Sequence, residues 1–358
     1  MDRIDIAKLF DRSRSQLRDE IVGLVLRQSF WQQRFGPEII DRLALDIVEG
    51  SLSALSKSIR YGAPMLFADQ VRWHRDQLQA VGGSTGHVRE ICTDIWNVAS
   101  AHLAESTLAA ISAPIQSAFD GLSYAGVAQR LGVFHADLAE ALVAATADAH
   151  WHWQAIYGPG GRDRALYEMW FFVDYVIDTL GSGKPDILRR ELIWMRNDLT
   201  SRGLSTLHVR QLAWLLDQEV AARLPGEAAA DLRHVMEVAL PAIDDHNESC
   251  RALLGAQELI VAEVADHLTT AGLSPHSDQT PAEVGWYLAY LADSIAAGTP
   301  GPMCNYTRWM QHWLSDQGLP DTPLRYSYEV LYRAVGQHLP ESASREAMAV
   351  IQAAQRLL

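Results

Sequence analysis

The chain has little cysteine, and what it has is scattered. Its three cysteines, Cys92, Cys250 and Cys304, stand at unrelated spacings among 358 residues. An odd number of isolated cysteines forms neither a disulfide framework nor a zinc cluster, so we expect a reducing compartment. The segment from Met1 to Arg12 lacks the apolar core of a secretion signal. Together these features predict a cytoplasmic protein.

Clusters of basic residues and long hydrophobic runs are also lacking. The formal net charge is −14, and binding to nucleic acid or to an anionic membrane needs clustered Lys and Arg. The most apolar stretch, Trp170 to Leu180, is shorter than the roughly 20 residues that span a bilayer, and it carries Asp174 and Asp178. We therefore expect no nucleic-acid partner and no membrane partner.

Signals for strands and for common catalytic motifs are scarce as well. Few β-branched residues alternate with polar ones, which argues against a sheet. The sequence contains no G-x-S-x-G elbow, Walker loop, dinucleotide fingerprint, C-x-x-C or H-E-x-x-H. The fold class predicted is therefore all-α, and no reaction is indicated by motif.

What the chain does contain is a repeated segment. Phe171 to Pro225 aligns without a gap on Trp286 to Pro340, 115 positions later, with fourteen identities in fifty-five positions. Ordinary residue frequencies would give about three or four. The first third matches the same template at a shift of 121, since His87-Val88-Arg89 aligns with His208-Val209-Arg210. We predict three tandem divergent repeats, each a roughly five-helix bundle, over residues 1–121, 122–244 and 245–358.

Each repeat is predicted to follow the same order of helices. The first helix is expected over 6–33, 135–156 or 248–270, and the second over 38–60, 164–180 or 281–297. The second ends before a Gly-x-Pro, in which Gly provides a left-handed stop and Pro begins the next helix. The third helix carries a shared tryptophan, which we expect to lie in the core. These tryptophans are Trp73, Trp194 and Trp309.

A carboxylate four residues before a histidine occurs in two repeats. Asp148 and His152 coincide with Glu263 and His267 under the shift of 115. This spacing places both side chains on one helix face, as in half of a helical-bundle metal site. A metal ion is one reading of these four residues, and local hydrogen bonds on an exposed helix are the other.

An acidic run at 244–248 (Asp-Asp-His-Asn-Glu) resembles a magnesium-binding motif of helical isoprenoid enzymes. The second motif of such enzymes is not found downstream. Because acidic residues at a helix N-terminus complement the helix dipole, we interpret the run as a linker and cap.

An arginine stands near the start of the fourth helix in every repeat: Arg89, Arg210 and Arg325. A guanidinium in this place can bridge two helices through a carboxylate, for which Asp178 and Asp293 are the candidates, or hold an anionic ligand in a bidentate fork.

Aromatic and histidine side chains gather in the second and third repeats. Such groups in a helical pocket suit a flat hydrophobic ligand or a tetrapyrrole, and they also suit a tight core. The candidate ligand-binding residues are His150, His152, Trp153, Tyr157, Arg210, Arg325 and His312.

Two function classes remain open. The first is a binding or regulatory module for a small hydrophobic or tetrapyrrole-like ligand or for a partner protein, and the order of helices has the general look of all-helical bacterial sensor domains. The second is an all-helical enzyme, metal-dependent or acting on an apolar substrate, with its site between the second and third repeats. Homo-oligomers are compatible with both.

Overall fold

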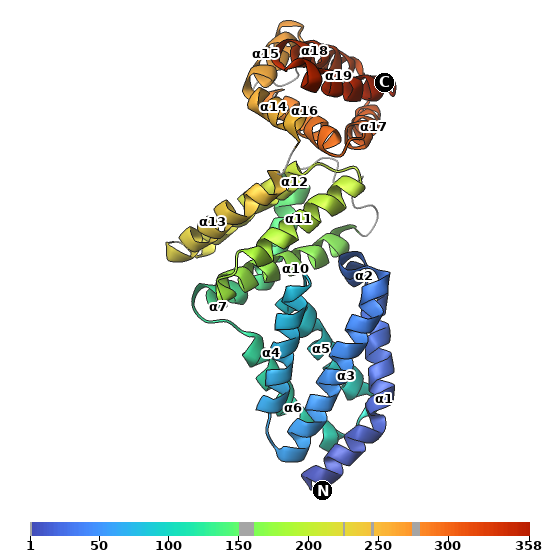
Figure 1. Ribbon diagram of the computed structural model, residues 1–358, viewed down its shortest axis with the longest axis vertical. Coiled ribbons are helices and arrows are strands. Elements are labelled where there is room, and N and C mark those ends of the chain that lie inside the picture. The colour runs from blue at the N-terminus through green and yellow to red at the C-terminus, as the bar shows by residue number, and fades with distance from the viewer. Residues whose placement is uncertain (1, 150–160, 225, 245–246, 274–279) are drawn as a thin grey trace. The chain divides into compact units, whose positions relative to one another are not determined.

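The computed structural model describes residues 2–149, 161–224, 226–244, 247–273 and 280–358 (Figure 1). Within these ranges the chain forms 18 α-helices, one short 3-10 helix and no β-strand, which confirms the all-α prediction. No helix among the described residues combines the length and the apolar character needed to cross a bilayer. The three cysteines are free thiols.

The helices run in the following order along the chain. They are α1 (Arg3–Arg27), α2 (Ser29–Phe35), α3 (Pro37–Tyr61), α4 (Met65–Ala80), α5 (Thr85–His102), α6 (Glu105–Leu122), α7 (Gly126–Val133), α8 (His135–Ala149), α10 (Gly161–Ser182), α11 (Asp186–Ser201), α12 (Leu207–Arg223), α13 (Glu227–Ala239), the 3-10 helix η1 (Leu240–Asp244), α14 (Glu248–Gly255), α15 (Gln257–Thr270), α16 (Thr280–Ala296), α17 (Gly301–Asp316), α18 (Thr322–His338) and α19 (Glu341–Gln355).

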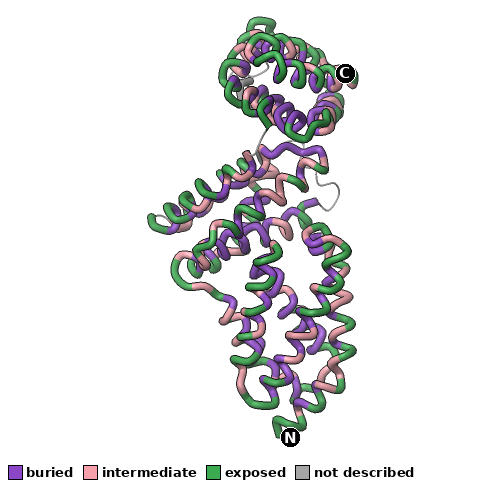
Figure 2. Tube along the Cα trace, in the orientation of Figure 1, coloured by how far each residue is buried: buried purple, intermediate pink, exposed green. Residues whose placement is uncertain are grey.

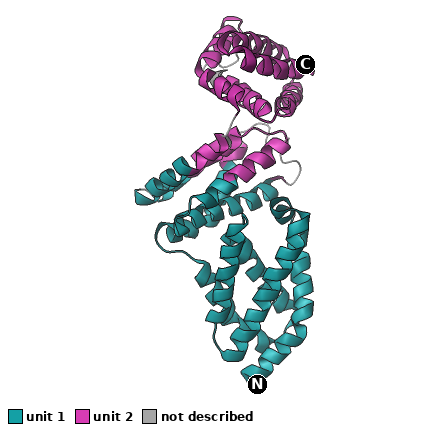
Figure 3. Cartoon of the chain, viewed as in Figure 1, with its two compact units in different colours: residues 1–144, 162–191, 217–238 teal, residues 145–161, 192–216, 239–358 magenta. Residues whose placement is uncertain are grey.

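Spatial contacts divide the chain into two compact units (Figure 3). The N-terminal unit comprises Met1–Ala144, Arg162–Glu191 and Asp217–Val238, and the C-terminal unit comprises Ala145–Gly161, Leu192–Leu216 and Ala239–Leu358. Each unit has its own apolar core, and buried positions alternate with exposed ones along the helices (Figure 2). The division into three repeats stays a prediction.

Two five-helix sets, one in each unit, pack in a corresponding way. In the N-terminal unit α1 packs on α3 and α5, α3 packs on α4 and α6, and α5 packs on α6. In the C-terminal unit α15 packs on α16 and α18, α16 packs on α17 and α19, and α18 packs on α19. Helices that take the same place in the predicted repeat therefore share these neighbours, although α4 also packs on α5 and α1 on α6, contacts that have no equivalent of similar extent in the described part of the C-terminal unit.

Glycines end the second helix of each predicted repeat as expected. Gly62, Gly183 and Gly298 have φ of 62°, 65° and 63°, a left-handed conformation that glycine adopts without a steric penalty. Pro64 and Pro300 lie at the N-caps of α4 and α17. The Gly-x-Pro pattern thus fixes these boundaries.

Two details of the prediction are wrong. The helix predicted first in the repeat is broken once in the first repeat and once in the third. The break after Arg27 separates α1 from α2, and the break at Ala256 separates α14 from α15. The shared tryptophans do not share one buried environment: Trp73 is 54% exposed, Trp194 is partly buried, and Trp309 is partly buried against the core of the C-terminal unit.

The large aromatic side chains that are fully buried lie elsewhere. Trp31, Tyr175, Tyr290 and Tyr328 have less than 2% of their surface exposed. Tyr175 and Tyr290 are 115 positions apart, on α10 and α16. The aromatic core of the repeated segment therefore includes these two tyrosines and Phe172, which is 1% exposed.

We expect Trp31→Ala to lower the free energy of unfolding by about 3–5 kcal/mol, because it removes a fully buried ring. It also removes the indole N–H that donates to Glu90 Oε2 at 2.7 Å. Trp73→Ala, the matched control in the same unit, should cost less than about 1 kcal/mol. Urea unfolding measures both values, and equal losses would contradict this account of the core.

Candidate ligand-binding site

A buried carboxylate of α10 binds the first turn of α5. Asp178 Oδ2 accepts the backbone N–H of Thr85 at 2.7 Å, and Asp178 Oδ1 accepts the Thr85 hydroxyl. The first N–H groups of a helix have no partner within the helix, and Asp178 supplies one. We call this contact of α10 with the start of α5 the first junction.

The first junction excludes water. Asp178 is fully buried and Thr85 is 1% exposed. Loss of hydration raises the pKa of Asp178 to about 6, although the two hydrogen bonds from Thr85 act in the opposite direction. The ionised carboxylate is thus held in place at a cost in solvation.

The same contact occurs between α16 and the segment that begins α12. Asp293 Oδ2 accepts the N–H of Thr206 at 2.8 Å and the hydroxyl of Ser205 at 2.6 Å. Asp293 Oδ1 accepts the Thr206 hydroxyl at 2.8 Å. We call this the second junction. Its carboxylate lies 115 residues after Asp178, and its threonine 121 residues after Thr85, which are the two shifts of the sequence repeat.

Both junctions also place a histidine against an aromatic ring of the facing helix. The ring centroids of His87 and Phe171 are 4.4 Å apart, and those of His208 and Trp286 are 5.0 Å apart. His87 Nδ1 accepts the Ser84 N–H at 3.1 Å, and burial, with a smaller effect of Arg34, lowers the pKa of His87 well below its ordinary value. This histidine is a neutral core residue.

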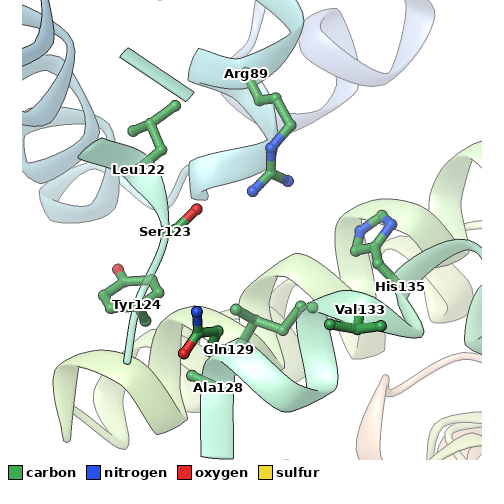
Figure 4. Close-up of a pocket in the computed structure, with 10 residues that line it drawn as sticks. Arg89, Leu122, Ser123, Tyr124, Ala128, Gln129, Val133 and His135 are labelled. Atoms are coloured by element: carbon green, nitrogen blue, oxygen red, sulfur yellow. The ribbon is translucent and has the colours of Figure 1, made fainter. Parts of the chain in front are cut away.

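A cavity of about 440 Å³ opens beside the first junction (Figure 4). Arg89, Ser123, Gln129 and His135 extend toward it from α5, from the segment after α6, from α7 and from α8. The remaining lining residues are Leu122, Tyr124, Ala128, Gly132, Val133 and Ile177. The lining is therefore apolar with a few convergent polar groups, as is usual for small-molecule sites.

Asp174 connects the two basic side chains of the cavity. Arg89 Nη1 donates to Asp174 Oδ1 at 2.8 Å, and His135 Nε2 lies 3.3 Å from Asp174 Oδ2 and 3.1 Å from the carbonyl oxygen of Trp170. Asp174 is 4% exposed and packs over Gly86, where a Cβ would lie 2.3 Å from its carboxylate. Only glycine at this position lets α10 approach α5 so closely.

Tyr124 ties the wall of the cavity to the first junction. Its ring packs over Gly181 of α10, where a Cβ would lie 2.1 Å from the ring, and Gln79 Nε2 donates to its hydroxyl at 3.1 Å. The Arg75 guanidinium lies 5.2 Å from the ring centroid. The segment that joins α6 to α7 is thereby held at one rim of the cavity.

The expected pairing with Asp178 is wrong for Arg89. Burial lowers the pKa of Arg210, and the charge of Asp293 opposes this effect. Both carboxylates accept hydrogen bonds at helix starts. Arg89 pairs with Asp174, Arg210 with Asp244 of η1, and Arg325 with Asp321 one turn earlier in the chain. Of the three arginines only Arg89 lines the described cavity.

Most of the predicted histidine cluster cannot be placed. His150, His152, Trp153 and Tyr157 lie outside the described residues, and of Asp148 only the position in α8 is described. His312 is exposed on α17. The tetrapyrrole prediction rests on this cluster and stays a prediction.

For the metal prediction, only Glu263 and His267 can be examined. Glu263 Oε2 lies 2.6 Å from His338 Nε2, and His267 is partly exposed on α15. Nowhere in the described part of the chain do three His, Cys, Asp or Glu side chains gather as metal ligands would. A site built on Asp148 and His152 is not tested, so the enzyme reading stays a prediction.

The acidic run at 244–248 serves partly as a cap. Asn247 is the N-cap of α14 and accepts the Cys250 N–H at 2.8 Å, and Glu248 lies in the first turn. Asp244 pairs with Arg210. These contacts agree with the linker-and-cap interpretation.

Sequence reasoning missed His135, which lines the cavity, and Asp174, which pairs with Arg89 beside it. His135 and Asp174 have no counterpart of their kind in the third repeat, where Cys250 and Ala289 stand 115 positions later. A search for shared positions discards them for this reason. Their helical positions alone do not indicate that they meet.

Comparison with known proteins yields no relative. No protein-family model, no curated protein and no solved structure matches the chain.

The raised pKa of Asp178 makes its contribution to stability pH-dependent. Because the folded-state value of about 6 exceeds the unfolded value, this contribution is present at low pH and is lost as the pH rises through 6. Lowering the pH from 7 to 5 should therefore stabilise the wild type by about 1 kcal/mol relative to Asp178→Asn. Urea unfolding at both pH values measures it. A constant difference would show that the carboxylate titrates as it does in water.

Proposed function

We propose that the chain is a small-molecule binding module built from three helical repeats, and that its ligand occupies the cavity beside the first junction. The observation that carries this proposal is the convergence of Arg89, His135, Ser123 and Gln129 on one cavity whose other walls are apolar. The four side chains come from separate segments of the N-terminal unit, which suits recognition of a ligand from several sides.

The repeat organisation is supported by contacts as well as by sequence identity. The two junctions use an aspartate, a threonine and a histidine in the same roles, at spacings of 115 and 121. A further pair of contacts recurs within the repeat. Thr179 Oγ1 accepts the Leu188 N–H at 3.1 Å, and Ser294 Oγ accepts the Met303 N–H at 3.0 Å.

The start of α18 differs in a way that the repeat model explains. Where the second repeat has Ser205, Thr206 and His208, the third has Pro320, Asp321 and Pro323. Proline has no backbone N–H, and Asp321 pairs with Arg325 in its own first turn. This helix therefore has fewer donors that need a carboxylate from a facing helix.

The polar residues of the cavity are accessible to a ligand, since both Gln129 and Ser123 are exposed. The cavity volume also lies within the range of small-molecule sites, about 300–1,000 Å³. We therefore propose an amphipathic ligand, with a polar end toward Arg89 and an apolar body along Leu122 and Ile177.

We expect 8-anilinonaphthalene-1-sulfonate, an amphipathic fluorescent probe, to bind with one site per chain, and Gly132→Leu to abolish that binding. Gly132 lines the cavity, and a Cβ built there meets no atom within 4 Å, so a larger side chain is tolerated there and we expect it to occupy part of the cavity. The matched control is Gly285→Leu on α16, whose Cβ also meets nothing.

Fluorescence titration of the three proteins decides the matter. Binding to wild type and to Gly285→Leu, with loss in Gly132→Leu, is the expected result. Absence of binding to wild type, or equal binding to Gly132→Leu, would contradict the assignment of the cavity.

The repeat model predicts a local effect of Asp293→Ala. Amide hydrogen exchange at Thr206 should accelerate at least about tenfold, because its N–H loses the buried carboxylate that accepts it. Asp321→Ala, in which the removed carboxylate lies at the surface, should leave exchange at Thr206 unchanged. If both variants alter exchange alike, the second junction is not held by Asp293.

A further inference from the structure

The two junctions provide a comparison that identifies the class of ligand. Arg89 and Arg210 are 121 positions apart, and each stands near the start of its helix, α5 or α12. At the second junction Arg210 pairs with the carboxylate of Asp244. The residue 115 positions before Asp244 is Gln129, which lines the cavity at the first junction.

The shift of 121 matches Asp244 with Ser123 instead, and Ser123 lines the same cavity. A buried residue precedes each of the three positions: Leu122, Ala128 and Ile243 are 0%, 2% and 1% exposed. Under either shift, the counterpart of the Asp244 carboxylate is a neutral polar side chain at the cavity that Arg89 also lines.

Arg89 retains hydrogen-bonding capacity toward this cavity. A guanidinium has five N–H donors, and of those of Arg89 the contact with Asp174 uses Nη1. The side chain of Arg89 is 39% exposed, whereas Asp174 is 5% exposed. Asp174 thus binds one edge of the guanidinium, and the other edge remains available to the cavity.

The other polar groups can add to the recognition of an anion. His135 lies against the same Asp174 and carries a positive charge when protonated. The Gln129 amide extends into the cavity and can donate (Figure 4). The apolar lining residues Leu122, Ala128, Val133 and Ile177 then surround the rest of the ligand.

We propose that the first junction binds a small monocarboxylic acid with an apolar chain, and that its carboxylate takes the place that the Asp244 carboxylate occupies at the second junction. This inference rests on the proposed function and specifies its ligand. Arg89 binds the carboxylate, with Gln129 and His135 beside it, and the apolar chain lies along α7 and α10.

The test compares hexanoate with hexanamide, which has nearly the same shape and no charge. Isothermal titration calorimetry on the full chain should give an affinity for hexanoate at least about tenfold higher than for hexanamide, since hydrogen bonds to a charged partner are the stronger ones. Acetate and octanoate in the same series report on the apolar chain, and octanoate should bind more tightly than acetate.

Two substitutions with matched controls address the arrangement of residues. Gln129→Asp supplies the carboxylate from within the chain, and hexanoate binding should fall at least about tenfold. Gln129→Asn shortens the side chain equally without a charge and should retain binding. Arg89→Gln should abolish the preference for hexanoate over hexanamide, and Arg325→Gln, at the surface of α18, should not.

The outcomes separate this inference from the proposed function. If Gly132→Leu blocks the fluorescent probe but hexanoate and hexanamide bind equally, or no monocarboxylate binds, the ligand class is wrong and the cavity assignment stands. If Gln129→Asp binds hexanoate as well as Gln129→Asn does, the comparison with Asp244 is wrong. If the probe does not distinguish Gly132→Leu from wild type, the proposed function itself fails.

Discussion

The structure depends on a single kind of interaction, in which a buried carboxylate of one helix accepts the free N–H and hydroxyl at the start of another. Asp178 does this for α5, and Asp293 does it for α12 and the residues before it. An unpaired N–H and an unpaired carboxylate would each be costly without water, so the two groups need each other. This mutual need sets how closely α10 approaches α5, and α16 approaches α12.

The candidate site follows from that approach. Once Asp178 holds the start of α5, Asp174 lies one turn away, over Gly86 and against Arg89. The segment after α6 passes along the same contact, because Tyr124 packs on Gly181. The cavity thus lies beside the contact of α10 with α5, and its chemistry depends on residues that differ between the junctions.

The sequence predicted the helices well and the site poorly, for physical reasons. Helix ends depend on local backbone chemistry, so Gly62, Gly183 and Gly298 could be recognised from a Gly-x-Pro pattern. The role of Asp178 depends on Thr85, which lies 93 residues away in the sequence. The repeat shows that the aspartate is shared between copies, but it does not show which residue the aspartate contacts. The shared tryptophans misled because identity between copies does not distinguish a core residue from a surface one, and Trp73 is 54% exposed.

The central claim is that the two junctions are the same interaction made twice. Double-mutant cycles measure it directly, with Thr85→Ala and Asp178→Asn at one junction and Thr206→Ala and Asp293→Asn at the other. The account predicts a coupling free energy of about 1.5–3 kcal/mol in each cycle, as for buried hydrogen bonds to a charged group. A coupling near zero at either junction would contradict it.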